Sequence, residues 1–337
     1  MANTLQEKTG LRPPRRLSRH LPPAAAGAGL GTFVRRHKLA PYLLLAPALA
    51  GIALVLLWPL VQVALYSFQN YGLPQITGAA PVQWVGLGNF SGTIADSEFW
   101  LSLRITVLFA AVAVPLTLIA GSVVGLLLNR LGPKMAGFVS TAALLAWATP
   151  PVSASVLFYW MFNPDGGLVD WTLSKLPNWL VGSTDWAGYN WTTNGALQAY
   201  TVMVLLVVWQ AFPFVAVTVL AGLKTIPAEV VEAARVDGAG PWRVFWRITY
   251  PLLKPIYLVL LLLSVIWDFN VFTQSYLLTG FPGNQDEFNL SLYIYDKAFQ
   301  FPPAYGLGGA LALIFTLILL IITVGYVRAS VRQGALT

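Results

Sequence analysis

The stretch "YGLGGALALIFTLILLIITVGYV" (residues 305–327) contains 23 residues and no charged side chain. About 20 apolar residues of helix cross the ~30 Å hydrocarbon core of a bilayer. The run is too long for a core strand, and a transmembrane β-barrel shows alternating segments of about 10 residues instead. Hydrocarbon offers no partner to backbone polar groups, so a helix is the remaining way to span it. The stretch therefore predicts an all-α membrane protein.

Five more segments of the chain have the same character. They cover residues 43–65, 105–128, 135–162, 196–223 and 256–278. Asp268 is the only Asp, Glu, Lys or Arg in all six segments. The whole chain is 57% hydrophobic and 10% charged, whereas roughly a quarter of the residues of a soluble domain are charged. We expect six transmembrane helices.

The distribution of cations predicts the orientation of these helices. With the chain threaded through six spans, 17 of the 20 Lys and Arg residues fall on the side that holds both termini. Cytoplasmic loops carry the excess of Lys and Arg in membrane proteins. Both termini are therefore expected in the cytoplasm, and the net charge of +7 indicates topology in a lipid membrane and not a nucleic-acid partner.

The same threading gives the expected domain organisation. Residues 1–38 are rich in Pro, Gly, Ala and Arg, which favours a disordered basic cytoplasmic tail. The remaining parts are a first transmembrane helix (39–68), an external cap (69–102), a core transmembrane domain (103–329) with a cytoplasmic loop (224–255), and a cytoplasmic C-terminal tail (330–337).

Several chemistries are excluded by residues that the chain lacks. It has no cysteine, and its two histidines, His20 and His37, both lie in the basic tail, so we expect no metal site. No GxxxxGK[ST] phosphate-binding loop is present, so the chain does not hydrolyse ATP itself. No recognisable catalytic set exists either. We expect no catalytic residues and no cofactor in this chain.

The cytoplasmic loop between the fourth and fifth segments has a structured pattern. Pro227 suits the first turn of a helix, and Asp237-Gly238 can end that helix with a left-handed glycine. A second short helix is expected from Gly240, after which Pro251 and Pro255 mark the return to the membrane. Such a hairpin could lie on lipid or dock into a protein groove, for which small residues beside the turn are suited.

Residues 232–255, "EAARVDGAGPWRVFWRITYPLLKP", resemble the EAA loop of permease subunits of bacterial ABC importers. "WVGLGNF" (84–90), "SYLLTG" (275–280) and "YGLGGALALIF" (305–315) are similar to motifs of the MalF/UgpA-like carbohydrate permeases. The resemblance implies the type I ABC importer permease fold, with the loop as a coupling helix. It also implies contact with the ATPase subunit through Glu232, Ala233, Ala234, Asp237 and Gly238.

The resemblance further implies an assembly in the bacterial cell membrane that imports a sugar or oligosaccharide. Its other subunits are a second, MalG-like permease, two ABC ATPase subunits that bind MgATP, and an extracytoplasmic sugar-binding protein or lipoprotein. Two features depart from the family pattern: "TGFPGNQDEFN" (279–289) replaces a GGP-containing stretch, and Arg104 stands where related chains often have Asn.

Asp268 favours a substrate path inside the membrane. A charge at bilayer depth is costly, which favours a wet cavity or a partner, and Trp267 beside it offers a flat ring for a sugar face. By resemblance, the path includes Gln210, Ala211, Phe214, Ser264, Trp267, Asp268 and Val271. Alternatively, Asp268 ties helices together and Trp267 packs within the bundle.

Two other functional classes fit the sequence less well than the importer. An ion-coupled secondary transporter would normally carry several ionisable groups within its spans, and this chain has one. An intramembrane enzyme would need a catalytic set that the sequence does not supply. The prolines inside the spans fit either tolerated kinks or helices bent around a central cavity.

Overall fold

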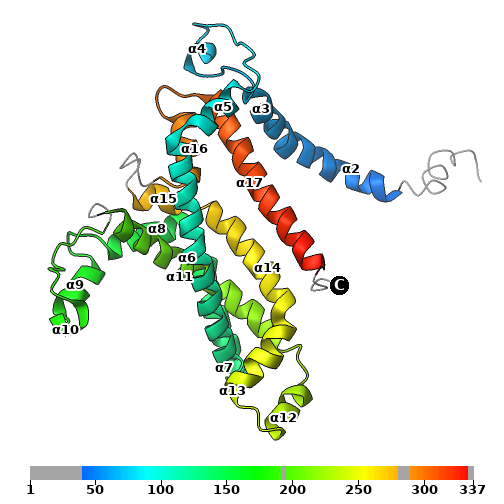
Figure 1. The fold of residues 1–337 in the computed structure, drawn as a ribbon, viewed down its shortest axis with the longest axis vertical. Helices are drawn as coiled ribbons and strands as arrows, with labels where there is room; N and C mark the ends of the chain where they lie inside the picture. The colour runs from blue at the N-terminus through cyan, green and yellow to red at the C-terminus, as the bar shows by residue number, and fades with distance from the viewer. Residues whose placement is uncertain (1–39, 192–194, 280–287, 333–337) are drawn as a thin grey trace, which may run out of the picture. The chain divides into compact units, whose positions relative to one another are not determined.

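The computed structural model describes residues 40–191, 195–279 and 288–332 (Figure 1). The predicted tail at residues 1–38 lies outside these ranges, as do residues 333–337 of the predicted C-terminal tail. The chain divides into two units, one ending at Pro59 and one starting at Leu60, which are described separately. The regular secondary structure of the described residues is helical, apart from one bridge between Gln69 and Trp84, so the all-α prediction is confirmed.

The first unit is an apolar helix whose side chains are exposed. It contains α2 (Ala40–Ile52), the π-helix η1 (Ala53–Leu57) and the start of α3 (Trp58–Tyr66). Leu44 is 82% exposed and Leu54 is 73% exposed. The π turn directly precedes Pro59, whose ring would clash with the carbonyl four residues back in a regular helix. The wider turn provides room for the proline.

The second unit contains the remaining helices and the loops that join them. In chain order these are α4 (Leu73–Ile76), α5 (Gly88–Ala95), α6 (Ser97–Leu128), α7 (Pro133–Trp147), α8 (Pro151–Met161), α9 (Leu168–Lys175), α10 (Asn178–Val181), α11 (Ala196–Leu223), α12 (Ala228–Val236), α13 (Pro241–Val244), η2 (Phe245–Thr249), α14 (Tyr250–Phe269), α15 (Thr273–Leu278), α16 (Leu290–Phe299) and α17 (Tyr305–Arg332).

The membrane spans agree with the predicted number when one bent pair counts as a single span. Among the described residues, five helices are long and apolar enough to cross a membrane, and α7 with α8 makes a sixth. These two helices are bent by 90° at their break. The bend follows from Pro150 and Pro151, because proline has no N–H to donate and disfavours a helical residue before it.

The fifth span differs from the prediction at both ends. The expected second helix of the loop begins at Pro241 with Gly240 as its N-cap. It continues without interruption to Phe269, so the prediction that it ends before the membrane span is wrong. The π turn η2 precedes Pro251 as η1 precedes Pro59, and a wider turn keeps the helix continuous where a proline was expected to break it. The helix then stops at Asn270, whose side-chain amide donates to the Ile266 carbonyl (2.8 Å).

The most extensive helix contact in the second unit joins α6 to α11, and small residues lie in it. A Cβ added to Gly125 would lie 2.8 Å from the Ala216 carbonyl oxygen, and one added to Gly121 would lie 2.9 Å from that of Phe212. Gly121 and Gly125 form the GxxxG spacing that lets two membrane helices approach closely. Two apolar clusters extend from this contact, and they bury Val215, Val219 and Leu220.

The contact predicts a strong effect of a side chain at Gly125. Gly125→Val should lower the free energy of unfolding by about 1–3 kcal/mol, because overpacking against a backbone carbonyl cannot relax by rotating a side chain. Thermal unfolding of the purified chain in detergent measures the change. Gly137→Val is the control, since a Cβ there meets nothing within 4 Å among the described residues; equal losses in both variants would contradict the prediction.

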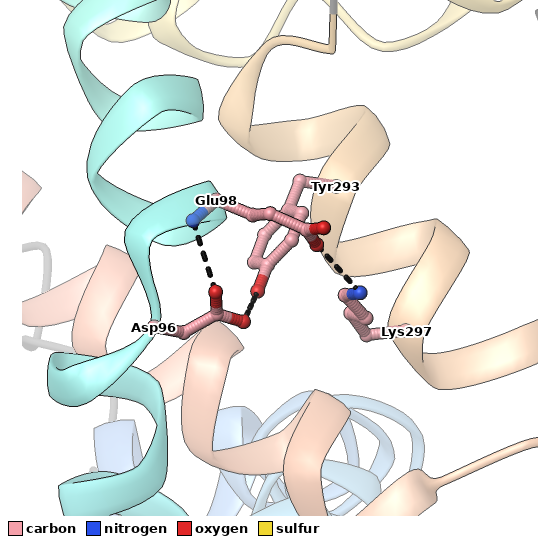
Figure 2. A network of polar contacts seen from close by, with 4 residues as sticks. All are labelled: Asp96, Glu98, Tyr293 and Lys297. Carbon is pink, nitrogen blue, oxygen red and sulfur yellow. Dashed lines mark hydrogen bonds and ion pairs between the residues drawn. The ribbon is translucent and has the colours of Figure 1, made fainter. Parts of the chain in front are cut away.

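A polar network joins α16 to the start of α6 (Figure 2). Asp96 caps α6 by accepting from the Glu98 N–H (2.9 Å), and its other oxygen accepts from the Tyr293 hydroxyl (2.6 Å). Lys297 forms an ion pair with Glu98 (2.8 Å) and lies over the Tyr293 ring, 5.3 Å from its centre. Burial and then the hydrogen bond to Asp96 raise the pKa of Tyr293 above its ordinary value.

The network therefore predicts an alkaline limit to stability. Burial alone would lower the pKa of Lys297, but the hydrogen bond to Glu98 and the charges of Glu98, Asp296 and Asp96 together raise it. A group whose pKa is higher in the folded chain than in the unfolded chain stabilises the fold while it is protonated. This stabilisation is complete below the unfolded pKa, about 10 for tyrosine, and is lost as the pH rises further. Unfolding measured from pH 8 to 11 should show this loss.

Tyr293→Phe isolates the tyrosine contribution. At neutral pH the variant should lose about 1.5–3 kcal/mol, the contribution of a hydrogen bond to a charged group, and its stability should fall less steeply above pH 10. Tyr159→Phe, at a side chain that is 46% exposed, serves as control. The interpretation fails if Tyr293→Phe and the parent chain lose stability in parallel across this range.

Candidate functional site

The break between α7 and α8 leaves one backbone carbonyl free for a side chain. The first turn of α8 is closed by the Ala154 N–H, which donates to the Pro150 carbonyl (3.0 Å). The carbonyl of Thr149 therefore lies outside the helix, and it accepts from the Gln210 side-chain amide of α11 (2.9 Å). A predicted path residue is thus anchored at the proline break.

A second glutamine continues this chain of amides. The Gln274 amide of α15 faces the Gln210 side-chain oxygen at 3.4 Å, the long end of the hydrogen-bond range. α15 begins after the break at residues 270–272, which is held in place by Asn289, whose amide donates to the Val271 carbonyl (2.6 Å). Gln210, in the middle of α11, therefore contacts the break before α8, and Gln274 follows the break before α15. Both glutamines keep further hydrogen-bonding capacity.

A row of aromatic rings runs beside the glutamines. Trp147, the last residue of α7, stacks on Phe214 of α11 with ring centres 5.4 Å apart and planes 22° apart. Phe214 meets Trp267 of α14 edge to face at 5.5 Å. Trp147 is 40% exposed and Trp267 is 42% exposed, so the row forms an open face. We call Trp147, Phe214, Trp267, Gln210 and Gln274 the ring and amide face.

The structure brings some of the predicted path residues together and separates others. Gln210, Phe214 and Trp267 share the ring and amide face, and Ala211 follows Gln210 in α11 as a half-buried residue. Ser264, Asp268 and Val271 are instead buried, at 5%, 4% and 3% exposure. One residue along a helix turns the side chain by about 100°, which separates Asp268 from the neighbouring Trp267.

Asp268 has an unusual environment for a carboxyl group. Its Oδ2 is buried and has no hydrogen-bond partner among the residues that the structure describes. A buried polar atom without a partner costs about 1–3 kcal/mol. In this conformation Asp268 is buried among neighbouring helices, as the alternative to a path role expects, whereas Trp267 is 42% exposed and does not pack fully within the bundle as that alternative expects.

Trp147 and Gln274 of the ring and amide face were not among the predicted path residues, and neither was the Thr149 carbonyl that anchors Gln210. Trp147 and the Thr149 carbonyl lie just before Pro150 and Pro151, the pair that bends the span. A proline pair inside a span frees backbone carbonyls and exposes the residues before it. That signal could have selected Trp147 and Thr149.

The loop with the EAA pattern ends its helix as expected. Gly238 has φ +79°, and the N–H groups of Gly238 and Ala239 donate to the carbonyls of Arg235 (3.0 Å) and Ala234 (2.9 Å). This pair of bonds is the Schellman motif, which closes the last carbonyls of a helix. A Cβ at Gly238 would meet nothing within 4 Å among the described residues, so the turn projects outward.

The helix α12 has two distinct sides. Ala228, Val231, Glu232 and Arg235 line a cavity against the bundle, and their spacing follows one helical stripe. Ala233 and Asp237 are exposed and do not line the cavity, and Val236 is 87% exposed. Ala234 is half-buried. Of the predicted coupling residues, Glu232 therefore faces the bundle, and Ala233, Asp237 and Gly238 are available to a partner.

Residues 113–333 match the family described as "Binding-protein-dependent transport system inner membrane component". The match covers more than half of the chain. The protein belongs to this family. The predicted resemblance to permease subunits of ABC importers is confirmed. The chain is a permease subunit of an ABC transport system, not its nucleotide-hydrolysing subunit.

Named relatives agree with the family assignment. The permease is 38% identical over 301 residues to the diacetylchitobiose uptake system permease protein DasB of Streptomyces coelicolor, covering 89% of each chain. It is 31% identical over 288 residues to the trehalose/maltose transport system permease protein MalF of Thermococcus litoralis, covering 85% of this chain and 92% of the other.

A solved structure supports the permease fold. The crystal structure of a bacterial alginate ABC transporter, in complex with an alginate pentasaccharide-bound periplasmic protein, contains a chain that superposes with a TM-score of 0.74. The match covers 91% of this permease and 99% of that chain at 20% sequence identity. At this identity, the likeness shows the fold.

Proposed function

We propose that this permease conducts a sugar or oligosaccharide, and that the ring and amide face is part of its path. The observation that carries the proposal is the row formed by Trp147, Phe214 and Trp267 beside Gln210 and Gln274. Flat aromatic rings bury the apolar face of a pyranose, and amides both donate to and accept from hydroxyl groups. Two relatives are named as permeases of uptake systems for diacetylchitobiose and for trehalose or maltose, and these names support this substrate class.

The openness of the face supports a shared path. Trp147 and Trp267 keep two fifths of their surface exposed, although both belong to apolar helices. In the membrane, an exposed aromatic row is covered by lipid, substrate or protein, and the amides beside this row favour substrate or protein. We propose that a second, MalG-like permease faces this row, so that each subunit supplies half of the path.

The charge distribution sets the proposed orientation. Both termini and α12 lie in the cytoplasm, because the connections on that side carry 17 of the 20 cations. An extracytoplasmic sugar-binding protein then delivers substrate at the opposite end, where α16 joins α6. The complex lies in the inner or plasma membrane of a bacterium, consistent with the description of the family.

Two ATPase subunits supply the energy. They bind MgATP and contact the outer side of α12 through Ala233, Asp237 and Gly238, with Glu232 and Ala234 supporting the helix from the bundle side. Movement of this loop would then switch the path between outward-facing and inward-facing states. Ser264, Asp268 and Val271 enter the path only if that switch turns their buried side of the bundle toward it.

The ring and amide face predicts a substrate-binding defect. Phe214→Ala removes the central ring, which contacts both tryptophans. The apparent KM for uptake should rise about tenfold, because the ring contacts that are lost contribute about 1.4 kcal/mol. Uptake of radiolabelled diacetylchitobiose, trehalose and maltose into proteoliposomes that contain the complete importer measures this. Gln210→Ala should have a comparable effect.

Trp179→Ala is the matched control for the loss of an aromatic ring. Trp179 is 84% exposed in α10, outside the face, and its variant should retain the parent KM. Asp268→Asn should also leave KM within about twofold, because its side chain is turned away from the face. Normal uptake by Phe214→Ala, or a larger defect in Asp268→Asn, would contradict the proposed path.

The coupling loop predicts a defect that depends on both backbone conformation and contact. Gly238→Val should lower sugar-stimulated ATP hydrolysis at least tenfold, because a β-branched residue at φ +79° costs of order 1–3 kcal/mol and fills the space left for the ATPase. Gly238→Asn tolerates the left-handed conformation and adds only the side chain. A defect in both variants indicates close contact, whereas a defect in Val alone indicates backbone conformation.

A glycine at the other end of the molecule provides the control. Gly78 has φ +74° and also open surroundings, so Gly78→Val imposes the same backbone strain far from α12. Its ATP hydrolysis and its co-purification with the ATPase should equal those of the parent. Unchanged coupling in both Gly238 variants would remove the basis for the docking role.

A further inference from the structure

A large groove opens on the bundle beside α12. It has a volume of about 1040 Å³, at the upper end of the ~300–1,000 Å³ typical of ligand pockets. Its walls come from the second half of α6, from α12, from residues 241–250 and from α14. The groove is separate from the ring and amide face, since it contains none of the residues that define that face.

The lining of the groove changes from charged to apolar along the helices. Arg130 follows the end of α6, and Arg235 lies in the last turn of α12. Lys254 and Glu232 also belong to this charged end, which leaves it with a net positive charge. Together, Arg130, Arg235 and Lys254 give three cations to one carboxylate, an arrangement suited to an anion.

The other end of the groove consists of apolar side chains from two spans. On α6 the lining continues from Arg130 back to Pro115, a distance of about 22 Å at 1.5 Å per residue. Ile119 is 60% exposed and Val123 is 51% exposed on this wall. Leu261 of α14 lines the opposite side. This part of the groove suits a hydrocarbon chain within the membrane.

Aromatic side chains line the groove along residues 242–257. Trp242, Trp246 and Tyr250 follow one another with ring centres 5.7 and 5.2 Å apart. Tyr250 then meets Tyr257 at 5.5 Å, and the Tyr257 hydroxyl donates to the Ser122 hydroxyl (2.9 Å). Tryptophan and tyrosine concentrate at the boundary between hydrocarbon and headgroups. The ladder therefore begins at the headgroup level with Trp242 and continues inward to Tyr257, whose partner Ser122 adjoins Val123 of the apolar end.

We propose that the groove holds an anionic phospholipid of the cytoplasmic leaflet. The phosphate lies between Arg130 and Arg235, and one acyl chain follows Ile119, Val123 and Leu261. The assignment to lipid rests on the change in polarity over about 22 Å, because a soluble anion would leave the apolar end uncovered. Basic pockets between transmembrane helices on the cytoplasmic side are suited to anionic headgroups. The inference rests on the cytoplasmic orientation in the proposed function.

The proposed lipid would act on the coupling loop. Arg235 lies on the bundle side of α12, and its backbone carbonyl accepts the Gly238 N–H that closes the Schellman motif. A phosphate bound to Arg235 would hold α12 against the bundle and leave its outer side open to the ATPase. The lipid is therefore a positive effector of coupling.

Native mass spectrometry of the full-length chain, purified from nanodiscs of phosphatidylcholine with a quarter of phosphatidylglycerol, tests the site. The parent should retain one phosphatidylglycerol in preference to phosphatidylcholine. Arg130→Gln with Arg235→Gln should lower the affinity roughly 30-fold, since each arginine near a surface contributes about a factor of five. Arg328→Gln with Arg332→Gln removes the same charge on the cytoplasmic end of α17, outside the groove, and should retain the lipid.

Ile119→Trp tests the apolar half of the groove without changing charge. It should release the lipid, whereas millimolar inorganic phosphate should not displace the lipid from the parent chain. Displacement by phosphate alone would identify a soluble-anion site and overturn the assignment to lipid. Equal lipid retention in all variants would show that the groove is not the binding site. Loss of the lipid from the parent chain when it is co-purified with a second permease would also overturn the proposal.

The experiment separates this inference from the proposed function. Lipid retention is measured on the purified chain without sugar or ATP, so absence of sugar uptake does not affect it. Absence of retention leaves the ring and amide face and its uptake prediction intact. Retention that is insensitive to the groove variants, together with normal sugar import, would reject the lipid site alone.

Discussion

The close approach of α6 and α11 at Gly121 and Gly125 is the contact from which the rest of the second unit is arranged. Lipid tails are as apolar as the side chains they touch, so burial of apolar surface does not drive membrane helices together. Packing without a side chain at these two positions places the backbone carbonyls of Phe212 and Ala216 directly against α6. The fixed α11 then presents Gln210 and Phe214 to the helices on its other sides.

The polar groups of the ring and amide face depend on interruptions of helices. Within hydrocarbon, a regular helix satisfies its own backbone and offers nothing to a polar ligand. The proline break before α8 releases the Thr149 carbonyl, and the break at Asn270 starts the short α15 that carries Gln274. Both interruptions are stabilised by side chains from distant parts of the chain, as in the bond from Asn289 to the Val271 carbonyl. The helices supply the frame, and the breaks supply the hydrogen-bonding groups.

The sequence predicted the spans because their length and lack of charge depend on local composition alone. It also predicted the end of α12, since the left-handed conformation of Gly238 is a local requirement. It could not assign Trp267 and Asp268 to different sides of the bundle, because neighbours on a helix differ by a rotation whose reference is set by packing. The uninterrupted helix through Pro251 was missed for another reason: a π turn that makes room for a proline has no sequence signal among the rules that place helix ends.

The two sides of α12 explain how one short helix can serve two contacts. Ala228, Val231, Glu232 and Arg235 recur at helical spacing and face the groove, so this side of the helix faces its own subunit. Ala233 and Asp237 remain outside with the glycine turn. A helix of nine residues is marginal without such support. In the proposed coupling, force from the ATPase on the outer side of α12 would reach the bundle through its inner side, which faces groove residues of α6 and α14.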